Sequence, residues 1–159
     1  DLAINPHTFK SMPYDPLKDF APVAVIGHTP FMLVAHPSLP VRTLADIIAM
    51  DRAAPGKLSI ATNTPRTLPH IVVAWLNRAA GMRMEQIPYP VMTQGMQDTV
   101  AGRTQLAILA VTTGSQFTQR GALRAHPWGA PAAHHAHPGY GRNVARTVPR
   151  WRWHLRCVG

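Results

Sequence analysis

The sequence contains a single cysteine, Cys157, and no apolar run of about 18 residues. One cysteine excludes an internal disulfide and a cysteine-rich zinc module. The lack of a long apolar run argues against a membrane-spanning helix. The chain begins at Asp1 without methionine or a signal peptide, so we expect that any targeting segment was removed or never belonged to it.

Acidic residues are scarce and occur only in the first part of the chain. Residues 1–98 hold all seven acids and eight Lys or Arg, which gives a net charge of +1. From residue 99 onward there are eight Arg, no Lys and no acid, and these account for the other +8 of the formal charge of +9. Such an excess favours a nucleic-acid or anionic-membrane partner. Here it belongs to one end of the chain.

Residues 126–159 also lack a periodic apolar face. They hold four prolines, three tryptophans, only four aliphatic side chains, and the cluster His134, His135 and His137. Neutral imidazoles can bind a transition metal, but no scaffold presents these three. We therefore predict no metal site and interpret the segment as an aberrant basic tail rich in Pro, His and Arg.

Between about residues 20 and 125, short apolar runs alternate with amphipathic segments. We expect strands at residues 20–26, 31–35, 57–62, 84–88 and 105–111, and helices at residues 44–53, 68–80 and 94–101. Thr43 followed by Asp46 predicts an N-cap for the first helix. The β-α-β-α-β order, with right-handed crossovers, predicts a small parallel sheet with helices packed on it.

The segment 68–80 has the clearest helical periodicity, and Gly81 is expected to end it. Pro69 falls in the first turn, where its missing N–H costs nothing. We expect Trp75 here, and Met96 in the next helix, to pack in the core. The predicted apolar face consists of Leu68, Ile71, Val72, Trp75, Leu76 and Ala79.

Two polar loops, at residues 62–67 and 89–93, follow predicted strands and precede predicted helices. Free N–H groups and the helix dipole favour an anion at such places. Neither loop has a Gly-rich nucleotide motif, and no pair of acids or nucleophile elbow suggests an enzyme, so we predict no catalytic residue and no cofactor. The candidate ligand-binding residues are Thr62, Asn63, Thr64, Arg66, Thr67, His70 and Thr93.

Three of these candidates have alternative interpretations. His70 is as well explained as a hydrogen-bonded histidine at the start of a helix as by ligand binding. Arg66 is equally compatible with a solvated loop, and Thr67 with a plain N-cap.

Five blocks of sequence, in order, resemble one family of receptors. They are residues 2–6 (LAINP), 13–22 (PYDPLKDFAP), 33–46 (LVAHPSLPVRTLAD), 55–58 (PGKL) and 87–89 (IPY). These are similar to the extracytoplasmic solute receptors of tripartite tricarboxylate transporters, the Bug-type receptors, from residue 2 to about residue 125.

The resemblance implies an α/β chain that is a fragment of a two-lobed type II periplasmic-binding-protein fold, with a parallel-type sheet and helices on both faces. Residues 1–38 would form the end of the first lobe and the crossover strands, and residues 39–125 the second, ligand-binding lobe. It also implies a periplasmic, monomeric receptor that captures a small carboxylate for membrane transporter subunits. Because half of the cleft is missing, we expect the chain alone to bind carboxylates weakly or not at all.

The chain departs from the family in both candidate loops. Thr64 and Arg66 stand at glycine positions and Thr67 at a serine position, while residues 89–92 (YPVM) replace a Tyr-Lys-Gly-Gly turn. Lost glycines restrict how closely backbone N–H groups approach a carboxylate. Arg66 offers a bidentate contact in compensation.

Beyond residue 125 the family continues with a Pro- and Gly-containing motif that is absent here. Reading residues 137–148 as degenerate codons in a shifted frame admits that motif, so we interpret residues 126–159 as an out-of-frame translation. Three alternatives remain open: a nucleic-acid-binding module that uses the Arg- and Trp-rich tail, an enzyme of unknown class, and a truncated product without function. Under the receptor interpretation we expect no nucleic-acid partner.

Overall fold

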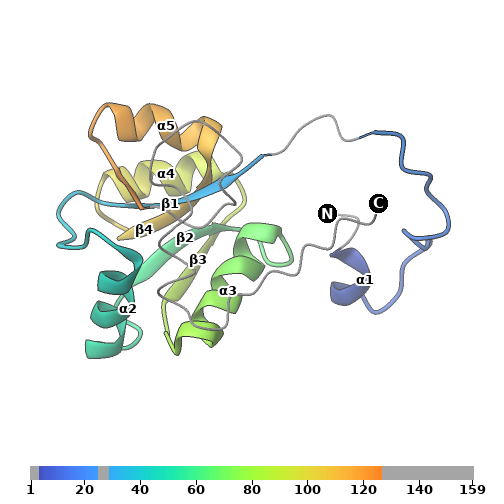
Figure 1. Ribbon diagram of the computed structural model, residues 1–159, viewed down its shortest axis with the longest axis horizontal. Helices are drawn as coiled ribbons and strands as arrows, with labels where there is room; N and C mark the ends of the chain where they lie inside the picture. Colours follow the sequence, from blue (N-terminus) through green and yellow to red (C-terminus); the bar gives the residue numbers. More distant parts are fainter. Residues whose placement is uncertain (1–3, 25–28, 127–159) are drawn as a thin grey trace.

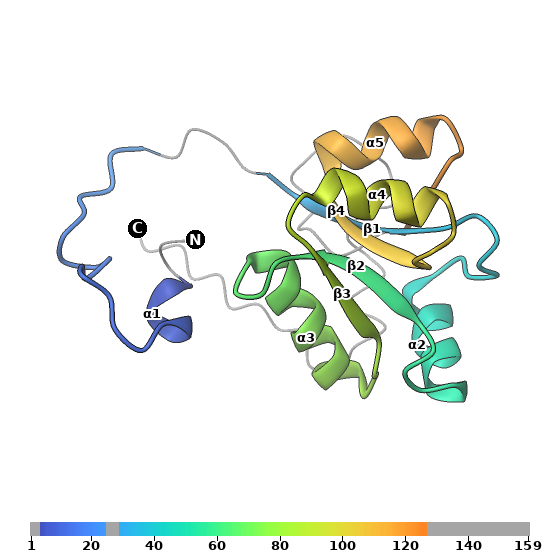
Figure 2. The same ribbon diagram turned by 180° about the vertical axis from the view of Figure 1, so that it is seen from behind.

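The computed structural model describes residues 4–24 and 29–126 (Figure 1). A short helix in the N-terminal segment lies outside the main body, in which helices cover a sheet (Figures 1 and 2). In the described residues, no helix has the length and apolar character needed to cross a membrane. The elements are α1 (Asn5–Thr8), β1 (Phe31–Ala35), α2 (Leu44–Ala53), β2 (Ser59–Asn63), α3 (Leu68–Ala80), β3 (Glu85–Tyr89), α4 (Met92–Val100), β4 (Leu106–Ala110), α5 (Val111–Gln119) and β5 (Arg124–His126).

The five strands form one sheet in the order β3-β2-β4-β1-β5. β2 lies between β3 and β4 and is parallel to both, as predicted. β1 instead runs antiparallel to β4, with Leu33 opposite Ile108, and β5 is antiparallel to β1. The α/β class with helices on both faces is confirmed, but the sheet is mixed rather than wholly parallel.

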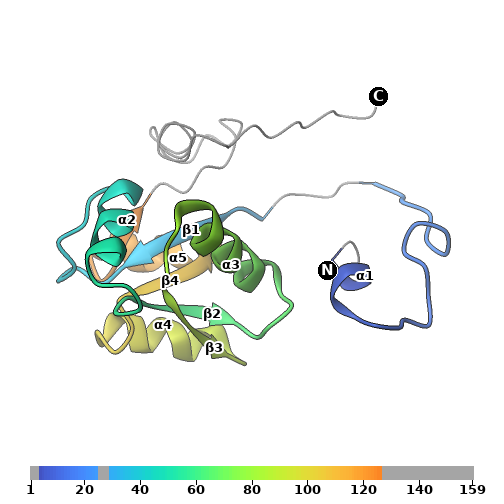
Figure 3. The same ribbon diagram turned by 90° about the horizontal axis from the view of Figure 1, so that it is seen from below.

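Alternating strand residues belong to two core clusters, one on each face of the sheet. Leu33, Ile60 and Ile108 join the cluster that α2 and α3 complete with Ile47 and Leu76. On the opposite face, residues such as Val34, Ala61 and Leu109 join Met96 of α4 and Leu123. Figure 3 shows α4 across the sheet from α2 and α3. Because neighbouring residues of a strand point to opposite faces, β1, β2 and β4 are buried on both sides.

The start of α2 and the end of α3 are as the sequence predicts. The Thr43 side chain accepts a hydrogen bond from the Asp46 N–H at 3.2 Å, and Asp46 accepts one from the Thr43 N–H at 2.8 Å. Gly81 ends α3 with φ = 65°, in the left-handed region that glycine tolerates.

Although Leu76 is buried and Val72 packs against the core as expected, the predicted orientation of α3 is wrong in part. Its buried residues are Pro69, Val73, Leu76 and Ala80, whereas Trp75 is 40% exposed. This helix carries apolar side chains around most of its circumference, so the period alone does not say which side meets the sheet. Met96, by contrast, is buried as expected.

The strand predicted at residues 20–26 is also wrong where the structure describes it. Residues 20–24 have no regular secondary structure, and Phe20 and Val23 are exposed. A strand is stabilised by pairing with a neighbour, and Pro22 lacks the N–H that pairing needs. The other predicted elements all lie within two residues of the observed bounds.

Helix α5 has no counterpart among the predicted elements. Its sequence, VTTGSQFTQ, is rich in β-branched residues and contains glycine, and such residues are poor helix formers. A Cβ at Gly114 would collide with the Met32 side chain on β1, so the glycine allows α5 to lie close against the sheet. Tertiary packing therefore overrides the local preference here.

Candidate functional site

Three strand-to-helix connections meet at one end of the sheet. β2 ends at Asn63 before α3, β3 ends at Tyr89 before α4, and β4 ends at Ala110 directly before α5. β2, β3 and β4 are mutually parallel in direction, so their carboxyl ends lie at the same edge. The N-termini of three helices are thereby brought to that edge.

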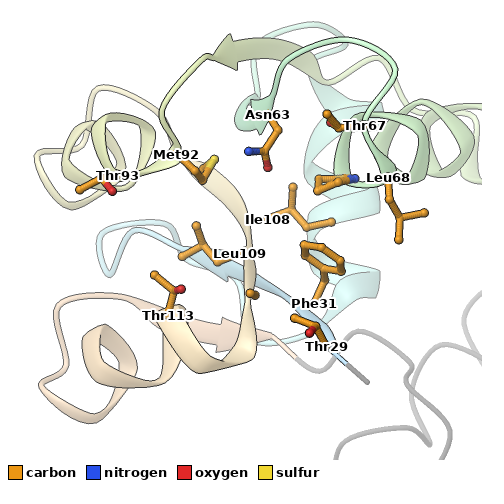
Figure 4. Close-up of a pocket in the computed structure, with 12 residues that line it drawn as sticks. Thr29, Phe31, Asn63, Thr67, Leu68, Met92, Thr93, Ile108, Leu109 and Thr113 are labelled. Carbon is orange, nitrogen blue, oxygen red and sulfur yellow. The ribbon is translucent and has the colours of Figure 1, made fainter. Parts of the chain in front are cut away.

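A pocket of about 600 Å³ opens between these connections (Figure 4). Its base is apolar, with Phe31, Ile108 and Leu109 from β1 and β4. Its polar side chains come from separate elements, and in Figure 4 Asn63 and Thr67 lie across the pocket from Thr113. The lining residues are Thr29, Phe31, Asn63, Thr67, Leu68, Pro69, Met92, Thr93, Ile108, Leu109, Ala110 and Thr113.

No side chain in this lining carries a formal charge. The polar groups are one amide and four threonine hydroxyls, which offer both donors and acceptors. Among the described residues, no group of three or more His, Cys, Asp or Glu is placed to hold a metal ion. The pocket therefore suits a ligand bound by hydrogen bonds and dipoles.

The helices that face the pocket differ from α2 in how they begin. α2 has a complete capping box, whereas α3, α4 and α5 have no side-chain hydrogen bond at the N-cap. Thr67 occupies the N-cap position of α3, but its hydroxyl donates to the Thr64 carbonyl at 2.8 Å. The Gln94 N–H donates to the Val91 carbonyl and the Val111 N–H to the Pro30 carbonyl. Other first-turn N–H groups have no intrahelical acceptor, so these three helices keep donors for an anion.

Three of the seven candidate binding residues line the pocket, namely Asn63, Thr67 and Thr93. Thr62 is fully buried, points to the face of β2 opposite to Asn63, and does not line the pocket. Thr64 is exposed outside the lining.

Arg66 and His70 also lie outside the pocket lining. Arg66 is exposed, has φ = 72°, and places its guanidinium 4.8 Å from the centre of the Phe9 ring. His70 is half-buried, and its Nδ1 is buried with no hydrogen-bond partner in the described chain, so the hydrogen-bonded alternative is not seen for that nitrogen.

Several lining residues were not among the candidates. Ile108 to Ala110 end a predicted strand, so the rule that ligands bind at carboxyl ends pointed to them. Thr113 had no such signal, because α5 was not predicted. Phe31 begins β1 and Thr29 precedes it, and the antiparallel direction of β1 brings its amino end to the carboxyl end of β4.

The turn between β3 and α4 is fixed by a hydrogen-bonded network beside the pocket. The Tyr89 hydroxyl donates to Asp98 Oδ2 at 2.8 Å, and Arg103 donates to Asp98 Oδ1 at 2.7 Å. These two donors, Tyr89 first, lower the pKa of Asp98 from its ordinary value of 3.8. Burial, and then the hydrogen bond to Asp98, raises the pKa of Tyr89 above 10.0. A Cβ at Gly95 would meet the Tyr89 ring at 2.8 Å, so this glycine makes room for the tyrosine.

The chain matches a family model described as the tripartite tricarboxylate transporter family receptor over residues 1–130. It is 28% identical over 124 residues to protein BugT of Bordetella pertussis, covering 78% of this chain and 38% of BugT. It is 30% identical over 115 residues to a UPF0065 protein of Pseudomonas sp. strain P51, covering 72% and 34%.

Solved structures also share the fold of this chain. A periplasmic transporter superposes with a TM-score of 0.80 at 25% identity, covering 93% of this chain and 50% of the other. The R. palustris protein Rpa4515 with adipate gives 0.72 at 26% identity, covering 89% and 47%. The chain thus spans 34 to 50% of the length of these relatives.

The family match covers the whole of the described fold, and the two structural matches share that fold. The match is to receptors rather than to enzymes, as the sequence predicted. The chain therefore belongs to the receptor family of the tripartite tricarboxylate transporters.

Proposed function

We propose that this chain forms one wall of a periplasmic receptor cleft and binds a small carboxylate for a membrane transporter. One observation carries the proposal: the uncapped N-termini of α3, α4 and α5 meet at a single uncharged pocket. A carboxylate there receives N–H groups and positive helix ends, and the pocket hydroxyls supply further donors.

The lining also favours a ligand with an apolar body. Phe31, Ile108 and Leu109 offer hydrocarbon surface, and no lining side chain is a cation that would neutralise three closely spaced carboxylates buried against it. A chain-like carboxylate such as adipate fits these surfaces better than citrate. The likeness to an adipate-bound protein supports this choice.

The proposal is tested by following backbone amide signals of the full chain in NMR while adipate is added. We expect a weak, saturable shift of the first-turn amides of Leu68, Thr93 and Thr113, and a smaller response to citrate. Thr113→Val keeps a β-branched side chain but removes the hydroxyl, and it should weaken adipate binding about tenfold.

Thr112→Val is the matched control, because Thr112 is exposed on the same helix and does not line the pocket. It should leave the titration unchanged. Shifts confined to another part of the described surface, or no response to any carboxylate at millimolar concentration, would overturn the proposal.

A further inference from the structure

Arg66 is the one residue other than glycine with positive φ in the described chain, at 72°. A side chain in this region is strained, because its Cβ crowds the backbone. Such strain persists only where surrounding structure holds it, and it is concentrated at functional sites. Arg66 therefore requires an explanation, and the pocket does not give one, since Arg66 is not part of its lining.

The contact that Arg66 makes is with the N-terminal segment. Its guanidinium lies 4.8 Å from the centre of the Phe9 ring, a distance suited to cation–π attraction. Phe9 directly follows α1 and is 45% exposed, so it is available for such a contact. In Figures 1 and 2 the segment with α1 lies near the turn between β2 and α3.

This turn is also the edge of the pocket. Thr67, the next residue, lines the pocket and holds the turn closed through both its N–H and its hydroxyl, which donate to the Thr64 carbonyl. Leu68 follows and also lines the pocket. Arg66 therefore directly precedes two residues of the pocket rim.

We propose that Arg66 and Phe9 form a latch that holds the N-terminal segment against the rim of the carboxylate pocket. The latch is made when the segment carrying α1 lies against the β2–α3 turn, and it is broken when the segment moves away. Arg66 is then a positioning residue that acts through the turn rather than a ligand contact. The inference rests on the proposed function only for the identity of the pocket's ligand.

Chymotrypsin reports on the latch directly, because it must take the Phe9 ring into its specificity pocket to cut after it. The test compares the rate of that cut in the full wild-type chain, Arg66→Gln and Arg66→Gly, with no ligand present. Breaking an exposed cation–π contact should speed the cut about two- to fivefold in both variants. Cleavage after Phe20, which packs edge-on against Tyr14, is the internal control and should not change.

The two variants separate a latch from a merely structural role. Arg66→Gly also relieves the strained backbone, so it should raise the melting temperature while it opens the latch, whereas Arg66→Gln keeps the strain. Arg78→Gln removes an exposed cation from α3 and should change the rate of cleavage neither after Phe9 nor after Phe20. Equal rates after Phe9 in wild type and both Arg66 variants would overturn the latch, and this result is independent of carboxylate binding.

Discussion

Thr62, one of the predicted ligand-binding residues, does not line the pocket. Its hydroxyl is buried on the face that α3 covers, with no hydrogen-bond partner in residues 4–24 and 29–126. His70 Nδ1 and Gln86 Oε1 are buried and unpartnered in the same way. A buried polar group without a partner costs about 1 to 3 kcal/mol, so we expect these groups to lower the free energy of unfolding.

Thr62→Val tests this cost at a single residue. Valine has nearly the same shape but no hydroxyl, so we expect the free energy of unfolding to rise by about 1 kcal/mol. The measurement is the urea unfolding curve at neutral pH. Thr62→Ser, which keeps the hydroxyl and removes a buried methyl group, should lower stability instead. A loss of stability in Thr62→Val would show that the hydroxyl is hydrogen-bonded, for example to a buried water molecule.

At the scale of secondary-structure elements, Asp98 of α4 links the end of β3 to the turn that follows α4. Tyr89 lies at the end of β3, Asp98 is in α4, and Arg103 lies beyond it. The lowered pKa of Asp98 means that the folded state binds this proton less tightly than the unfolded state. The stabilisation is complete above the unfolded pKa and is lost as the pH falls through the lower, folded one.

Asp98→Asn should therefore reduce the loss of stability that occurs at acidic pH. We expect wild type to lose thermal stability as the pH falls below about 4, and the variant to lose less over the same range. Melting temperatures between pH 2 and 7 provide the measurement. Glu85→Gln removes an exposed acid from β3 outside this network and should keep the wild-type slope. Parallel curves for wild type and Asp98→Asn would contradict the assignment.

At the scale of the whole molecule, the members of both core clusters among residues 4–24 and 29–126 all belong to the body. Their members, including the partly buried residues packed against them, run from Phe31 to Leu123. The candidate His cluster and the Arg- and Trp-rich segment at residues 126–159 lie outside the described residues, apart from the backbone of His126. The out-of-frame origin of that segment, and the division of the chain at residue 38, stay predictions.

A chain ending at residue 126 should therefore unfold at the same urea concentration as the full chain. Removing residues 127–159 also removes five arginines and no acid, so any binding to DNA at low salt should weaken strongly. Urea unfolding and a salt-dependent DNA titration measure the two effects. A clearly lower unfolding midpoint would mean that the removed segment contributes to stability. Unchanged DNA binding would place the basic surface in the body.

Local interactions explain why much of the fold was predictable. The capping box at Thr43, the left-handed Gly81 and the alternation of strands and helices depend on residues a few positions apart. The same is true of the placement of the polar loops at strand ends. Sequence alone therefore pointed to this edge of the sheet, and three of its seven candidate residues, Asn63, Thr67 and Thr93, line the pocket found there.

Contacts between distant residues decided the rest. The direction of β1 depends on its pairing with β4, and the formation of α5 on its packing against β1. The rotation of α3 about its own axis decides which of its apolar residues are buried. Because successive residues of a strand point to opposite faces, Thr62 is buried while Asn63 lines the pocket. These outcomes require the positions of residues far apart in the chain, which local propensity and periodicity do not contain.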